Sequence, residues 1–467
     1  MARPNVLVIV LDTARADALE PYGAAPGTTP ALAQLANSGR ALADVHATAC
    51  WTMPSHASMF TGLLPRAAGL QRAPGERPMG CKPVLEAAAD RLLPEVLGRA
   101  GFRTRAVSSN LWIATGTGFA TGFDEFRDVS PNRVGRLVAT GLRDRASWAF
   151  DALRARSDDG AATAGEVLRG WFAEDADGPQ FWFVNLIECH SPYLPPKPWN
   201  DLGPLDRLRA AEEARRHLTL SEIWRVCVSD FDVPDDALAR MRHLYDRSIT
   251  QLDAWVADTL TALDEAGKLD DTLVLICSDH GENFGEGGLL AHAYSLDERL
   301  LHVPFIAAGP NAPSEMTSLV ELPRVIADAV QLDDHPWDRE HPAAAVAQFD
   351  PPGEDPDDPR KLEAVKAWGA GPEALEKLSM TMECAVRDGT KLWRRGDTLE
   401  LYDLREDPLE ERPRIVSRSD APPDLLAAIE NQAAGPVVTA AAQTEAPTAS
   451  PEELARIEEQ MRTLGYL

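Results

Sequence analysis

Cysteine is scarce in this chain, and none of the six cysteines stands in a C-x-x-C pair. The missing pairs exclude a zinc knuckle and a dithiol redox motif, and so few cysteines in 467 residues are typical of a reduced, intracellular protein. Long apolar runs are also missing. No segment is long enough to span a bilayer, and the run before Asp12 is too short for a signal-peptide core and lacks a cleavage site. We therefore expect a cytoplasmic protein without a membrane partner.

Positive charge is the second scarcity. The chain has 46 lysines and arginines against 73 aspartates and glutamates, which gives a net charge of −27, and only seven of the basic residues are lysines. A protein that binds nucleic acid or an anionic membrane surface needs a basic face, so the composition argues against both kinds of partner. An acidic protein that handles a small anion needs local positive charge, and a bound metal ion is its usual source.

Apolar, β-branched runs alternate with helical periodicity up to Gly309. The runs predict strands that are buried on both faces, and the periodic segments predict helices between them. The expected strands are 5–11, 104–109, 180–187, 272–277 and 303–307, and the expected helices are one from Pro30 to its stop at Gly39, 84–100 and 238–266. The alternation predicts an α/β fold, in which helices flank a large, mainly parallel sheet on both faces.

The character of the chain changes after this α/β region, for which we expect a catalytic domain over residues 1–335. A smaller subdomain is expected over 336–434, because 335–360 reads as a Pro/Asp-rich loop and 380–404 alternates apolar and polar residues like antiparallel strands. An Ala/Thr/Pro-rich stretch predicts a flexible linker over 435–450, and 451–467 contains a short amphipathic C-terminal helix.

Two acidic motifs follow expected strands directly. Asp12 comes after the first strand, and Asp279 and His280 come after the strand 272–277. Ligands of open α/β sheets bind outside the carboxyl ends of the strands, so these side chains are expected to converge. Two carboxylates and an imidazole suit a divalent ion such as Zn, Mn, Ca or Mg. The alternative is that the three residues only form a cap and a turn.

Thr52 lies in the segment ACWTMPSHASMFTG, where Pro54 precedes an expected helix from Ser55 to Phe60. Free backbone amides and the helix dipole at such an N-terminus stabilise an anion. A hydroxyl beside a divalent cation is a candidate nucleophile. The alternative is that Thr52 only caps the helix.

His190 follows the strand 180–187, and His292 lies in the loop after the second acidic motif. Both are candidates to contact an anion or to protonate a leaving group, although single histidines are more often structural or solvated. Glu188 and Glu282 are candidates to support these groups, or are themselves solvated.

Taken together, these segments resemble the sulfatase family of the alkaline phosphatase superfamily. PNVLVIVLDTARADALEPYG resembles the family's opening strand with its metal-binding aspartate, TMPSHASMFTGLLP its nucleophile segment, SDHGE its second metal motif, and LYDLREDPLE its C-terminal ending. The resemblance covers most of the chain. It implies an α/β core with a mixed sheet and a smaller C-terminal subdomain of antiparallel strands and a helix.

The departures from the family pattern bear on the chemistry. The family makes its formylglycine nucleophile from a Cys or Ser at the position of Thr52, whereas Cys50 stands two residues out of register. Threonine does not yield formylglycine by that chemistry, so we expect none. Other family positions also differ, namely the motif arginine (here His56), the second aspartate (Thr13), a lysine and a histidine (Asn110 and Trp112) and a second lysine (His292).

The set of Asp, Thr, Asp and His resembles superfamily members that form a phosphothreonine, such as phosphodiesterases, phosphomutases and phosphoethanolamine transferases. The resemblance implies a metal-dependent hydrolase that cleaves a sulfate, phosphate or phosphonate ester of a small organic substrate through a Thr52 adduct. One metal, or an incompletely filled pair, is favoured. The roles assigned are metal binding by Asp12, Asp279 and His280, catalysis by Thr52, His190 and His292, and substrate contact by His56 and Asn110.

Two alternatives remain open at this point. One is a transferase that passes the bound group from Thr52 to a second acceptor, and the other is a catalytically silent binding protein of the same fold. Specificity for the organic part of the substrate is expected to come from the segments 114–128, 202–233 and 335–360, which are interpreted as loops. The sequence leaves the oligomeric state open.

Overall fold

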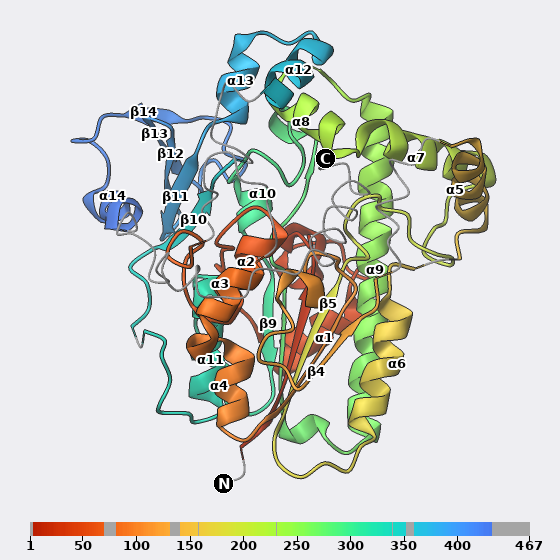
Figure 1. Ribbon diagram of the computed structural model, residues 1–467, viewed down its shortest axis with the longest axis vertical. Coiled ribbons are helices and arrows are strands. Elements are labelled where there is room, and N and C mark those ends of the chain that lie inside the picture. The colour runs from red at the N-terminus through yellow and green to blue at the C-terminus, as the bar shows by residue number, and fades with distance from the viewer. Residues whose placement is uncertain are drawn as a thin grey trace.

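The centre of the computed structural model, which describes residues 3–69, 81–130, 141–156, 158–229, 231–338, 340–351 and 359–431, is a seven-stranded sheet. Its strand order is β2-β9-β6-β1-β5-β3-β4 (Figure 1). The strands are β1 (Asn5–Leu11), β2 (Arg40–Ala41), β3 (Arg103–Ser108), β4 (Glu125–Asp128), β5 (Gln180–Leu186), β6 (Thr272–Cys277) and β9 (Phe305–Ala308). β9 pairs antiparallel with both of its neighbours, β2 and β6, and the other pairs are parallel. The expected mainly parallel α/β sheet is confirmed.

Helices cover both faces of this sheet, as the buried strands require. Alternate residues of β1 enter two separate apolar clusters: Val6, Val8 and Val10 lie in one, and Leu7 and Ile9 lie in the other. The first cluster includes α2 (Thr52–Thr61), α4 (Leu93–Arg99) and α11 (Leu322–Ala329), and the second includes α1 (Pro30–Ser38), α6 (Ala161–Phe172) and α9 (Asp235–Glu265). Figure 1 shows these two groups on opposite sides of the strands.

A separate antiparallel sheet follows in the C-terminal part, in the order β10-β11-β12-β13-β14. Its strands are β10 (Ala345–Phe349), β11 (Met382–Arg387), β12 (Thr390–Arg395), β13 (Thr398–Asp403) and β14 (Arg414–Val416), and α14 (Pro423–Glu430) contacts β11. The antiparallel strands expected over 380–404 are present as β11, β12 and β13. The linker over 435–450 and the helix over 451–467 lie outside the described residues.

Four segments differ from expectation. The helix over 84–100 is divided into α3 (Lys82–Ala87), a short 3-10 turn and α4, because Pro94 has no amide hydrogen and the chain is extended at Leu92. The segment 335–360 contains β10, whose run AVAQF lies between polar flanks. The segments 114–128 and 202–233 are not plain loops. The first contains β4, and the second contains α7 (Pro204–His217) and α8 (Leu220–Val228). Charged residues hide the periodicity of α7. Three further helices are α5 (Leu142–Arg154), α12 (Pro359–Trp368) and α13 (Pro372–Leu378).

Helix α9 spans 31 residues and is charged along its outer side. Within the described ranges, no helix is both long enough and apolar enough to cross a membrane.

A buried lysine joins the antiparallel sheet to the part of the chain that contains the seven-stranded sheet. Lys391 of β12 is fully buried, and its Nζ donates to the Leu296 carbonyl oxygen at 2.6 Å and pairs with Glu298 at 2.9 Å and Glu410 at 2.8 Å. Burial alone would lower the pKa of Lys391, but the two carboxylates raise it above its usual value. Glu298, which begins α10 (Glu298–Leu301), also lies 3.0 Å from His46 Nε2. The protonation states of the lysine, the two glutamates and the histidine at this junction therefore depend on one another.

We predict that Lys391→Ala lowers the free energy of unfolding by about 3–5 kcal/mol, because it leaves two buried carboxylates without their cation. Urea denaturation measures the change, and Lys377→Ala, at an exposed position of α13, is the matched control. A loss below about 1 kcal/mol, the range of a surface ion pair, would show that water replaces the lysine.

Candidate active site

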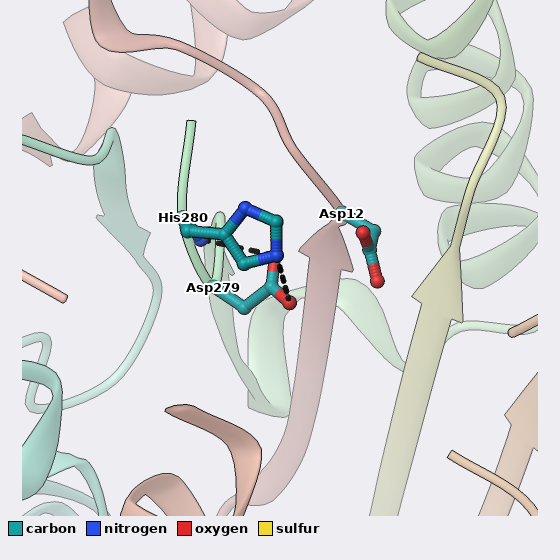
Figure 2. A group of neighbouring side chains, drawn as sticks. All are labelled: Asp12, Asp279 and His280. Atoms are coloured by element: carbon teal, nitrogen blue, oxygen red, sulfur yellow. Dashed lines mark hydrogen bonds and ion pairs between the residues drawn. The ribbon is translucent and has the colours of Figure 1, made fainter. Parts of the chain in front are cut away.

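Asp12, Asp279 and His280 lie together at the carboxyl end of the sheet (Figure 2). Asp12 directly follows β1, and Asp279 and His280 follow β6, the neighbouring strand. Their ligand atoms lie within 4.8 Å of one another, and all three side chains are fully buried. The convergence expected from the strand ends is therefore present.

The donor set fits a divalent cation. Asp12 Oδ1 and Asp279 Oδ2 are buried and make no hydrogen bond, although the His56 and His280 imidazoles lie 3.3 and 3.4 Å from Asp279 Oδ2. Without a cation, burial and the Asp279 carboxylate raise the pKa of Asp12 well above its usual range. Burial lowers the pKa of His280 to about 4, against the opposing effect of Asp279, so its imidazole is neutral at pH 7. His280 Nδ1 lies 2.9 Å from the Gly281 carbonyl oxygen and carries the proton, which leaves a lone pair on Nε2.

Neighbouring groups fix the two carboxylates. The Thr13 amide donates to Asp279 Oδ1 at 3.2 Å, and Asn110 Nδ2 donates to Asp12 Oδ2 at 2.7 Å. The backbone after His280 passes so close to the next segment that a Cβ at Gly281 would overlap the Arg299 carbonyl oxygen. Only glycine fits at this position, because any side chain would displace the loop that carries Asp279 and His280.

Thr52 is the first residue of α2, and its Oγ1 lies 3.4 Å from His280 Nε2. Trp51, with an extended backbone, occupies the N-cap position and makes no side-chain cap bond. The alternative interpretation of Thr52 as only a helix cap is therefore wrong. The helix begins earlier than the expected Ser55, and this brings the Thr52 hydroxyl to the metal-ligand cluster. Cys50, two residues earlier, is fully buried in the apolar core.

His56 and Asn110, the two residues expected to contact substrate, are both buried and contact metal-ligand candidates. His56 Nδ1 lies 3.0 Å from the Thr52 carbonyl oxygen and 3.3 Å from Asp279 Oδ2. Its Nε2 lies 2.7 Å from Asn185 Nδ2. Sequence reasoning missed Asn185, although a single polar residue near the end of an otherwise apolar strand is a detectable signal.

His190 and His292 meet at the less buried side of the cluster. Their ring centroids are 5.0 Å apart, and the His292 ring lies 4.5 Å from that of His280. His292 Nδ1 lies 2.9 Å from Glu282 Oε1, and this carboxylate raises the pKa of His292 despite the opposing effect of burial. Burial and the nearby His292 lower the pKa of His190. One imidazole is thus suited to donate a proton, and the other to remain neutral.

Glu188 lies away from this cluster. It is buried, and its Oε1 accepts the Ala161 amide at 2.6 Å, at the N-terminus of α6. Burial and the nearby Asp159 raise the pKa of Glu188 to about 8. Glu188 is therefore not solvated, and it does not contact the metal-ligand candidates. The sequence had left both possibilities open.

The raised pKa of Glu188 predicts how stability changes with pH. The folded state keeps the Glu188 proton, while the unfolded chain releases it near its ordinary pKa of 4.5, so stability is lost as the pH rises from 4.5 to about 8. Glu188→Gln removes this loss and keeps an oxygen for the Ala161 amide. We expect the variant to melt at a higher temperature than the wild type at pH 8 and at the same temperature at pH 4.5. An equal difference at both pH values would assign the effect to packing.

The model of the sulfatase family matches residues 4–334. The chain belongs to the sulfatase family. The matched range includes every strand of the seven-stranded sheet and all the candidate metal ligands, so the family match and the site geometry concern the same part of the molecule.

Three similar proteins illustrate the range of the family. A sulfatase of Formosa agariphila is 23% identical over 332 residues, which are 67% of this chain and 65% of that protein. A choline-sulfatase of Rhizobium meliloti is 34% identical over 115 residues, which are 23% of this chain and 22% of that protein. The chain thus spans less than two thirds of either relative. The structure of a phosphonate monoester hydrolase of Agrobacterium radiobacter has a TM-score of 0.61 and 20% identity, with 90% of this chain and 92% of that chain covered. This likeness shows that the two share a fold.

Proposed function

We propose that this member of the sulfatase family is a metal-dependent hydrolase that cleaves a sulfate, phosphate or phosphonate ester of a small organic molecule through a covalent adduct on Thr52. The observation that carries the proposal is the position of the Thr52 hydroxyl, 3.4 Å from His280 Nε2 at the start of α2. The sulfate and phosphonate classes are those of the similar proteins, which include sulfatases and a phosphonate monoester hydrolase, and the phosphate class comes from the resemblance to proteins that form a phosphothreonine.

Asp12, Asp279 and His280 would hold the cation. Two carboxylate oxygens and one imidazole nitrogen are ligands accepted by Zn, Mn, Ca or Mg, so the donor set does not select one of these ions. When bound, the divalent ion would lower the pKa of a neighbouring hydroxyl and attract the negative oxygens of the ester.

Thr52 Oγ1, having lost its proton to solvent, forms a bond to the sulfur or phosphorus of the ester, and the bond to the leaving alcohol oxygen breaks. His292, whose pKa is raised by Glu282, supplies the proton that the leaving oxygen needs. Amides at the start of α2 offer hydrogen bonds to the remaining oxygens, where charge is concentrated during transfer. The Nδ1 proton of His190 points to the Ser191 carbonyl oxygen at 2.9 Å, so His190 donates to these oxygens from Nε2 only as the imidazolium. Water then cleaves the adduct, which restores the Thr52 hydroxyl and releases the inorganic anion.

The experiment that tests this function is a screen of aryl sulfates, phosphate monoesters, phosphodiesters and phosphonate esters with Zn, Mn, Ca and Mg. The proposal predicts turnover of at least one ester class that stops after chelation and returns with one of the ions. Turnover that survives complete chelation would contradict it. A product in which the anion is joined to an added alcohol would identify a transferase.

A further inference from the structure

The turn that carries Asp12 has an unusual backbone. Thr13, the next residue, has φ of 65°, in the left-handed region that β-branched side chains rarely adopt. This conformation directs the Thr13 amide to Asp279 Oδ1 at 3.2 Å, so one peptide unit links the residues after β1 and β6. A strained residue of this kind persists only where surrounding contacts hold it.

Cys189 Sγ contacts the Asp12 carbonyl oxygen and Thr13 Oγ1 on one side of the turn. The contact that joins its two ends comes from Tyr245, a fully buried residue of α9. Its hydroxyl donates to the Thr13 carbonyl oxygen at 2.9 Å and accepts the Arg15 amide at 2.7 Å. One phenol therefore bridges both ends of the turn that follows Asp12. Its ring is fixed in turn by Phe284, at a centroid distance of 4.9 Å.

Helix α9 is itself attached to α1 and α6, which lie beside it. Asp253 accepts the Leu32 amide of α1 at 2.8 Å, and Trp255 Nε1 donates to the Ala161 carbonyl oxygen of α6 at 2.7 Å. The Tyr245 hydroxyl is consequently a fixed point relative to the sheet, and not a mobile surface group.

We propose that Tyr245 is a positioning residue for the metal site: its hydroxyl holds Thr13 in the left-handed conformation in which Asp12 and Asp279 converge. Tyr245 contacts none of the candidate metal ligands and acts only through the Thr13–Arg15 backbone. The inference rests on the metal site of the proposed function.

The test compares Tyr245→Phe with Tyr22→Phe in Mn²⁺ titrations of the metal-free protein, with free Mn²⁺ measured by electron paramagnetic resonance. Tyr22 is a matched control, because its hydroxyl also joins two backbone groups, the Phe305 amide at 2.7 Å and the Leu42 carbonyl at 3.0 Å, but next to β9. We expect Tyr245→Phe to weaken Mn²⁺ binding by about 10- to 100-fold, the range for groups that orient metal ligands, and Tyr22→Phe to leave it unchanged.

Thr13→Gly separates strain from a general loss of folding, because glycine adopts positive φ without steric cost. In the Thr13→Gly background, the loss of Mn²⁺ affinity caused by Tyr245→Phe should become several-fold smaller, and this comparison also serves if Tyr245→Phe alone does not fold. An undiminished loss in that background would overturn the inference, and so would wild-type affinity in Tyr245→Phe or an equal loss in Tyr22→Phe. A wild-type protein that binds no Mn²⁺ would instead contradict the proposed metal site.

Discussion

Thr52→Ala is expected to reduce ester turnover by a factor on the order of 10³ or more, because the alanine side chain offers no oxygen for adduct formation. The fold and the metal content should remain, since Thr52 Oγ1 contacts only His280 and caps no helix. Thr52→Ser keeps a hydroxyl at the same helix position and should retain part of the activity. Rates, metal analysis and circular dichroism of the three proteins are the measurements.

The matched control for this pair is Thr61→Ala, a threonine at the other end of α2 whose hydroxyl donates to the Ala57 carbonyl oxygen. It should leave kcat unchanged.

Intact mass should also show an unmodified Thr52, with no formylglycine, because a secondary alcohol cannot be oxidised to that aldehyde. Near wild-type turnover by Thr52→Ala would favour direct attack by water.

Asp12→Asn is expected to weaken divalent-metal binding by more than about 100-fold, which is more than the loss for groups that only orient ligands. Activity should fall with it. The metal-free variant should nevertheless melt at least as high as the metal-free wild type, because the substitution removes a buried charge that Asp279 repels. Weaker metal binding together with an equal or higher melting temperature of the metal-free protein would identify Asp12 as a metal ligand. The loss of a structural carboxylate would instead lower the melting temperature.

Thermal melts with and without metal measure this effect, and Asp407→Asn is the control. Asp407 is also buried, but its oxygens accept the Glu411 and Arg412 amides in the C-terminal part of the chain. Its loss should lower the melting temperature without changing metal affinity. Equal metal affinity in Asp12→Asn and the wild type would remove Asp12 from the ligand set.

Sequence periodicity predicted the elements that are apolar through their whole length. The strands around Val8, Val184 and Leu275 are buried on both faces, so their composition alone distinguishes them. Strands β2 and β4 were missed because they are short or half exposed at sheet edges. The helix α7 was read as a loop because most of its residues are polar.

The site could be predicted as far as it depends on strand ends. Asp12, Asp279 and His280 directly follow strands, so their convergence follows from the topology. The roles of His56 and Asn110 could not be predicted, because only the packing of α2 against the sheet shows that both face the carboxylates. The cytoplasmic location stays a prediction.

The central claim is that the transferred group passes through Thr52. The most direct test is the stereochemical course of hydrolysis, measured on a phosphonate ester whose two non-bridging oxygens are different isotopes, in water that carries the third oxygen isotope. Two successive in-line displacements, first by Thr52 and then by water, predict retention of configuration at the transferred atom. Inversion would show a single displacement by water and would contradict the account.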